Sequence, residues 1–172
     1  MRPGGFGQLS LDVNYNSIGS RALGGFGRQQ NARQMIISKK VEFSASHICR
    51  SGKLSDAENE RIYGAAANPL SHGHNYVVEV AIEGEPDPVT GMILDLKRLK
   101  DVLEERVLSV YDHRLLNREV ASFENLVPTV ENIAIDIWKR IEGHIDASGR
   151  ARLYSVRVHE TSELFVEYRG GA

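Results

Sequence analysis

The stretch Ser71–Val80, SHGHNYVVEV, places two histidines one residue apart at the start of a segment with strand periodicity. Side chains on a strand alternate between its two faces, so residues of one parity line the same face. One parity is almost wholly apolar apart from the histidines, and it comprises His72, His74, Tyr76, Val78, Val80 and Ile82. The other parity carries Asn75, Glu79 and Glu83. The pattern predicts a half-buried strand over His72 to about Gly84, with both imidazoles on its apolar face.

The preceding segment, MIISKKVEFSASHIC, predicts a second strand with a third histidine on the buried face. Its apolar parity comprises Ile37, Val41, Phe43, Ala45, His47 and Cys49. An antiparallel pairing of the two strands would bring His47 close to His72 and His74. Three converging neutral imidazoles are the ligand set of a catalytic zinc ion, which keeps a fourth position for water or substrate. The alternative is three hydrogen-bonded core histidines, because a buried ring nitrogen without a partner costs roughly 1–3 kcal/mol.

The remaining elements predict an α+β fold. Ser55 and Glu58 form a capping-box signal for a short helix in the polar excursion between the two strands. Two amphipathic helices are predicted after Asp95 and Thr129, each of which can cap a helix N-terminus. Two strands then end the chain, ARLYSVRVHE and ELFVEYR. The order ββααββ predicts a four-stranded antiparallel sheet with two helices on one face. Its exposed edges favour a closed symmetric assembly.

The amino-acid composition of the chain limits the classes of binding partner that we expect. The 172 residues are 41% hydrophobic, and 21 Lys and Arg nearly balance 23 Asp and Glu. A nucleic-acid or membrane partner is therefore not expected, and no apolar run reaches the 18 or so residues of a membrane-spanning helix. The only cysteine, Cys49, excludes an internal disulfide and favours a cytoplasmic protein. Residues 1–34 are rich in Gly and Arg and predict a flexible tail or, alternatively, an organelle transit peptide; residues 35–172 predict the folded domain.

Two further groups of titratable side chains are candidates for a role in binding or catalysis. Glu160 shares the parity of Tyr154, Val156 and Val158, so a carboxylate ends an apolar row. Such a group is usually paired with a cation or a fork of N–H donors, unless the strand simply emerges into solvent there. Asp112 and His113 are adjacent in a predicted loop, where a carboxylate can orient an imidazole as a general acid or base. The alternative for this pair is a solvated loop.

From Val41 onward the chain resembles the 6-pyruvoyltetrahydropterin synthase family. The motifs FSASH, LSDAEN, NPLSHGHNY, DPVTGMILDL, DHRLLN, PTVENIA and VHET occur in the family's order and approximate spacing. The resemblance implies the tunnelling fold, in which the sheets of a trimer close into a barrel and two trimers stack into a homo-hexamer. Active sites then lie between subunits.

The resemblance also implies a reaction and the roles of site residues. The substrate would be 7,8-dihydroneopterin triphosphate, converted to 6-pyruvoyltetrahydropterin with loss of triphosphate. His47, His72 and His74 would bind Zn²⁺, and Glu160 would anchor the amino-pyrimidine edge of the pterin. Thr129 and Glu131 match the helix start near the pterin. Asp112 and His113 match the pair that assists proton transfer.

The chain departs from the family at one position. The family's catalytic cysteine falls on Ala66, within GAAANPL, and a methyl group cannot accept a proton. Three explanations remain open: an engineered Cys-to-Ala change, a natural variant with a displaced base or another 6-substituted product such as 6-carboxytetrahydropterin, and a paralogue that binds pterin without turnover. Cys49 is either the displaced base or a small buried apolar residue.

Overall fold

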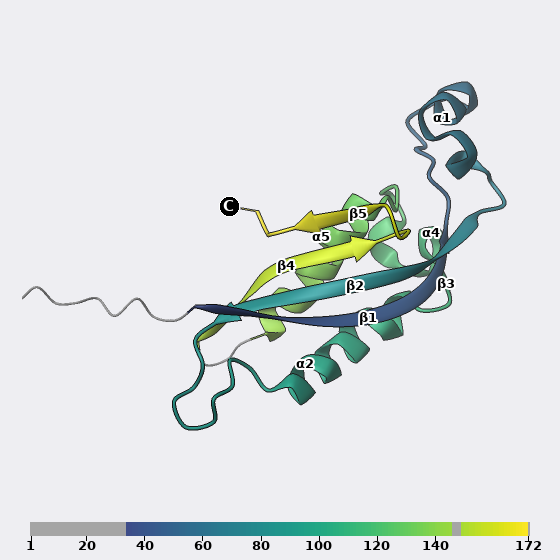
Figure 1. The fold of residues 1–172 in the computed structure, drawn as a ribbon. Helices are drawn as coiled ribbons and strands as arrows, with labels where there is room; N and C mark the ends of the chain where they lie inside the picture. The colour runs from purple at the N-terminus through teal and green to yellow at the C-terminus, as the bar shows by residue number, and fades with distance from the viewer. Residues whose placement is uncertain (1–33, 146–148, 172) are drawn as a thin grey trace, which may run out of the picture. The chain divides into compact units, whose positions relative to one another are not determined.

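A computed structural model describes residues 34–145 and 149–171 (Figure 1). The tail predicted over residues 1–34 lies outside them except for Gln34. The strands are β1 (Met35–His47), β2 (His72–Gly84), β3 (Arg114–Leu115), β4 (Ala151–His159) and β5 (Phe165–Tyr168). The helices are α1 (Asp56–Tyr63), α2 (Leu96–Leu103), α3 (Ser109–Tyr111), α4 (Leu116–Glu119) and α5 (Val130–Ile141). Single helical turns occupy Gly64–Ala67, Glu104–Leu108, Ala121–Phe123 and Glu142–His144.

The sheet confirms the α+β class and corrects the predicted strand count. Its order is β3-β1-β2-β4-β5, so the described residues form five strands where the sequence predicts four (Figure 1). Four strands pair antiparallel, but β3 pairs parallel with β1 through Ala45–Arg114 and Ser46–Leu115. A two-residue strand has no alternation to detect, which is why this segment reads as a loop in the sequence.

The core lies between one face of the sheet and the helices. Phe43 on β1, Tyr76 on β2 and Val158 on β4 bury their side chains on this face. The helices cover it with Leu99, Leu103, Val107, Ile133, Ile137 and Ile141. Asp95 caps α2 and Thr129 caps α5, as predicted. Because the inward row of β1 and β2 continues to His47, His72 and His74, the core face ends in imidazoles.

A bulge in β4 corrects the parity predicted for Tyr154. The register between β2 and β4 shifts between Ala81 and Ile82, which pair with Ser155 and Leu153. Leu153 therefore takes the core position, while Tyr154 lies beneath the Arg169 guanidinium, 5.1 Å from the ring centroid. The added residue lies before Val156, so Val156, Val158 and Glu160 keep a common parity.

The segment that connects β1 to β2 is held in place by polar contacts. The capping box of Ser55 and Glu58 forms as predicted. Asn59 is buried, and its amide hydrogen-bonds to the backbone of Ser51, Leu54 and Ser55. These contacts return the chain to the sheet, where the Cys49 N–H donates to the Ala66 carbonyl at 2.9 Å.

At the β5 edge of the sheet, the C-terminal segment packs on α5. The Trp138 ring meets Tyr168 edge-on at 5.5 Å. Gly170 has a φ of +83°, and a Cβ there would come within 2.7 Å of the Trp138 ring. This crossing therefore requires glycine. Across residues 34–145 and 149–171, none of the helices has the length and apolar character needed to span a bilayer.

Candidate functional site

Three histidines converge at one end of the buried sheet face. One ring nitrogen from each of His47, His72 and His74 lies within 4.8 Å of the other two. The register explains the meeting, because β1 and β2 pair His47 with His72 and Ala45 with His74. The Nε2 atoms of His47 and His72 are 2.9 Å apart. His47 is only 1% exposed, so the cluster extends from the core toward a partly exposed rim.

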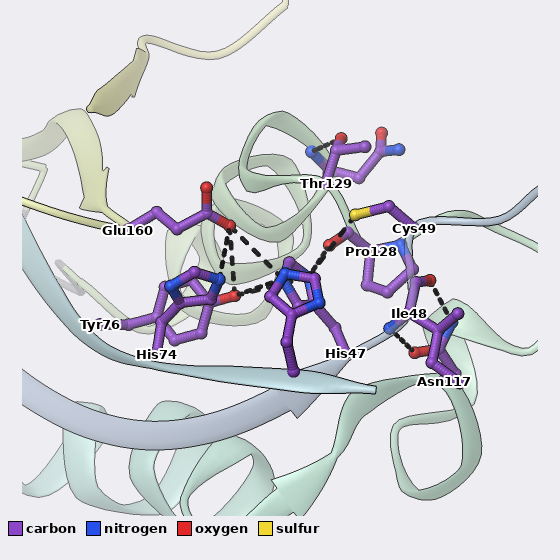
Figure 2. Close-up of polar contacts among 11 residues, drawn as sticks. His47, Ile48, Cys49, His74, Tyr76, Asn117, Pro128, Thr129 and Glu160 are labelled. Atoms are coloured by element: carbon purple, nitrogen blue, oxygen red, sulfur yellow. Dashed lines mark hydrogen bonds and ion pairs between the residues drawn. The ribbon is translucent and has the colours of Figure 1, made fainter. Parts of the chain in front are cut away.

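The tautomer of His47 is set by a backbone carbonyl. Its Nδ1 lies 2.7 Å from the Pro128 carbonyl oxygen, which can only accept a hydrogen bond (Figure 2). In the neutral ring Nδ1 therefore carries the proton, and Nε2 directs a lone pair at the other two histidines. A metal-ligating imidazole usually donates its other ring N–H to a carboxylate, a water or a backbone carbonyl such as this one.

The other two rings hold nitrogens without hydrogen-bond partners. His72 Nδ1 and His74 Nε2 are buried and unpaired among the residues that the structure describes. Burial is the main cause that lowers the pKa of His47 and of His72, so both rings favour the neutral, lone-pair form. Three converging imidazoles, two of which hold a nitrogen without a described hydrogen-bond partner, suit a borderline-soft cation such as Zn²⁺.

Glu160 and Tyr76 complete the polar end of this face. Glu160 Oε1 lies 3.5 Å from His47 Nε2 and 3.7 Å from His74 Nε2 (Figure 2). The Tyr76 hydroxyl is 3.5 Å from the same oxygen, and burial raises the pKa of Tyr76. The Glu160 side chain is 16% exposed, so the carboxylate faces the histidines and does not emerge into solvent. Sequence reasoning missed the role of Tyr76, although it shares the parity of His72 and His74.

The start of α5 borders the cluster. Pro128 contacts His47, and the following Thr129 accepts the Asn132 N–H at 3.5 Å as the helix cap. Glu131 is exposed in the first helical turn. Pro128 was not predicted as a site residue, because its backbone carbonyl has no signature in the sequence.

Cys49 lies behind His47, with its Sγ 3.9 Å from Nδ1. Its side chain is buried, and burial, followed by the charges of Glu160 and Glu131, raises the pKa of the thiol to about 11. The thiol is therefore protonated near neutral pH, which favours the interpretation of Cys49 as a small apolar residue. Its backbone contact places Ala66 beside it.

Asp112 and His113 form a pair, but the chain does not bring them to the histidine cluster. His113 Nδ1 lies 2.9 Å from Asp112 Oδ2, and the Ser44 N–H donates to Asp112 Oδ1 at 3.0 Å. That backbone hydrogen bond is the main cause that lowers the pKa of Asp112. The His113 side chain is 83% exposed and lines a cavity of about 610 Å³ with outward-facing Ser44, Ser46 and Asn75. Of the three clustered histidines, His74 also lines this cavity, whereas His47 and His72 do not.

Comparisons with known proteins show which family this chain is similar to. A sequence profile described as 6-pyruvoyl tetrahydropterin synthase matches residues 36–171. The 6-pyruvoyl tetrahydrobiopterin synthase of Poecilia reticulata is 43% identical over 134 residues, covering 78% of this chain and 89% of that protein. The human protein of the same name is 41% identical over 137 residues, covering 80% and 92%.

A solved structure extends the similarity to the fold. The Caenorhabditis elegans 6-pyruvoyl tetrahydropterin synthase superimposes with a TM-score of 0.76 at 38% identity, covering 80% of this chain and 96% of that chain. The resemblance carried by the sequence motifs is confirmed by both comparisons.

Proposed function

This chain belongs to the 6-pyruvoyl tetrahydropterin synthase family, and on that premise we propose that it is a zinc-dependent lyase acting on 7,8-dihydroneopterin triphosphate. Its product would be 6-pyruvoyltetrahydropterin, formed with loss of triphosphate. The observation that carries the proposal is the meeting of three imidazoles, one ring nitrogen of each lying within 4.8 Å of the other two, with His72 Nδ1 and His74 Nε2 lacking hydrogen-bond partners in the described part of the chain.

His47, His72 and His74 would hold the metal ion. When bound, Zn²⁺ supplies a Lewis acid that polarises the side-chain oxygens of the substrate and stabilises negative charge as a carbon-bound proton leaves. The contribution of the chain is orientation, because Pro128 fixes the His47 tautomer before any ligand arrives.

Glu160 would bind the amino-pyrimidine edge of the pterin. Its carboxylate is an acceptor, and a fork of N–H donors is the chemistry that such a group pairs with. Tyr76 donates toward Oε1 at 3.5 Å, which leaves the second oxygen, Oε2, for the ligand. Thr129 and Glu131, at the start of α5, would border the same ring.

Asp112 and His113 would move the proton. His113 shares its cavity with His74 but not with His47 or His72, so a site that uses both the pair and the full histidine cluster would draw them from different subunits. This separation supports a homo-hexamer, built as a dimer of trimers, with active sites between subunits.

A second function is favoured by Ala66. The methyl group offers no base, and the neighbouring Cys49 thiol is protonated. A related side-chain cleavage that yields another 6-substituted pterin, such as 6-carboxytetrahydropterin, is therefore the alternative lyase. A pterin-binding protein without turnover is the alternative outside the enzyme class.

One experiment separates these functions. The full chain and its Ala66→Cys variant are loaded with Zn²⁺ and incubated with 7,8-dihydroneopterin triphosphate, and released triphosphate and the pterin product are measured. We expect zinc-dependent release of triphosphate and formation of 6-pyruvoyltetrahydropterin, at a higher rate in Ala66→Cys because a thiol then stands at the family's base position.

Each of the other possible outcomes identifies a different function. A different pterin product identifies the alternative lyase. Tight binding of pterin without release, in both proteins, identifies the binding protein. Failure of the wild-type chain to take up zinc would contradict the proposal itself.

A further inference from the structure

Asn117 holds the backbone immediately after His47 at two points. The Ile48 N–H donates to Asn117 Oδ1 at 2.8 Å, and Asn117 Nδ2 donates to the Ile48 carbonyl at 2.9 Å (Figure 2). Ile48 lies just beyond the last ladder pair of β1, which joins His47 to His72. The side-chain amide of Asn117 therefore continues the strand by one residue where the sheet offers no further partner.

We propose that Asn117 is a positioning residue for the histidine cluster. His47 would then be fixed twice, through its ring by the Pro128 carbonyl and through the following peptide by Asn117. Its Nε2 has to remain beside His72 Nε2 for the three nitrogens to converge, and ligand positions must be held to within about 0.5 Å. Rotation of the chain at Ile48 would swing the neighbouring imidazole away from that point.

The position of Asn117 along the chain links the histidine cluster to the segment that carries Asp112 and His113 of the same subunit. It lies in α4, directly after β3, in the segment that begins with Asp112 and His113. The same segment contacts β1 through the parallel pairing of β3 and through the amide of Asn117. Asn117 therefore fixes the cluster relative to the proton-transfer pair of its own subunit.

A role in packing alone makes a different prediction. If the two hydrogen bonds only satisfy a buried backbone, their loss lowers the stability of the fold and leaves the metal site unchanged. The inference rests on the proposed zinc site, so the test uses the metal alone and measures the wild-type chain first.

The test compares Asn117→Ala and Asn117→Asp with Asn125→Ala, an exposed asparagine on the neighbouring loop. Zinc affinity is measured by competition with a chromophoric chelator, the absorption of bound Co²⁺ reports ligand geometry, and metal-free melting temperatures report stability. We expect Asn117→Ala to bind zinc 10- to 100-fold more weakly with an altered Co²⁺ spectrum, and Asn125→Ala to match the wild type. Asn117→Asp keeps the acceptor but turns an oxygen toward the Ile48 carbonyl, so it also weakens binding.

If the variants melt at lower temperature yet keep wild-type zinc affinity and spectrum, Asn117 is a packing residue and the inference is wrong. Should Asn117→Ala fail to fold, Asn117→Asp alone decides between the two outcomes. No zinc binding by the wild-type chain would remove the proposed function first, and the inference with it.

Discussion

The three imidazoles differ in how the chain holds them. His47 is fixed at its ring by Pro128, while His72 and His74 have nitrogens without a described partner. The sequence predicted all three because a period of two and an antiparallel pairing are enough to place them on one face. It did not predict Pro128, Tyr76 or Asn117, since a backbone carbonyl, a hydroxyl in an apolar row and a side-chain amide in a four-residue helix leave no pattern.

At the residue scale, we expect Cys49→Ala to keep the turnover and zinc affinity of the wild-type chain. The thiol is buried and its pKa is raised to about 11, so it cannot serve as a base near neutral pH. The smaller side chain should lower the free energy of unfolding by about 1 kcal/mol through the space it leaves. Triphosphate release, chelator competition and urea denaturation measure the three quantities.

Cys49→Ser is the matched control, since it keeps the branching and number of heavy atoms of the side chain while replacing the thiol by a hydroxyl. Loss of turnover with zinc still bound, in both variants, would make Cys49 the displaced base and overturn this interpretation.

Among the elements, the contact between α3 and α5 fixes the turn that carries Asp112 and His113. Tyr111, the last residue of α3, is fully buried and its hydroxyl donates to Asp136 on α5. Arg140 Nε donates to the same carboxylate at 2.7 Å. Asp112 follows directly, so the helix pair sets where this turn begins. The amphipathic pattern predicted α5 and a helix from Asp95 to Val110, which the structure forms as α2, Glu104–Leu108 and α3 in succession. The bulge in β4 depends on tertiary contacts that periodicity does not register.

At this scale, we expect Tyr111→Phe to lower the free energy of unfolding by about 1–2 kcal/mol, because the Asp136 carboxylate loses a buried donor. Urea denaturation measures the change. Tyr63→Phe, at a partly exposed tyrosine, is the control and should be near neutral. Equal stability of Tyr111→Phe and wild type would show that Arg140 alone satisfies Asp136.

For the molecule as a whole, the two groups assigned to the proposed reaction lie in different parts of the sheet. The histidine cluster lies at the end of the core face, and His113 lines a cavity on the outward face that only His74 of the cluster also lines. Sequence reasoning identified both groups but could not assign them to opposite faces, because the residues near His113 form a turn in which parity has no meaning. His113 itself has a φ of +60°, a conformation that few residues other than glycine adopt.

Mixed assemblies test this separation. His72→Ala and His113→Ala chains, each inactive alone, are unfolded together in equal amounts and refolded with zinc. If each site takes its histidines from one subunit and the proton-transfer pair from a neighbour, about a quarter of the sites regain both wild-type groups. Triphosphate release should then return to about a quarter of the refolded wild-type value.

Refolding each variant separately is the control, and both should stay inactive. A mixture that also stays inactive, although the sedimentation of its particles matches that of the wild type, would mean that each site is built within a single subunit.

The crossing of Gly170 over Trp138 makes the only tryptophan a natural optical reporter. The indole lies nine residues along α5 from the Thr129 cap, roughly 13 Å at the rise of a helix. Its emission therefore senses whether the C-terminal edge is docked, while titrations of the histidine cluster are read by other signals. Detachment of that edge and events at the cluster can thus be followed independently in one cuvette, without an added dye.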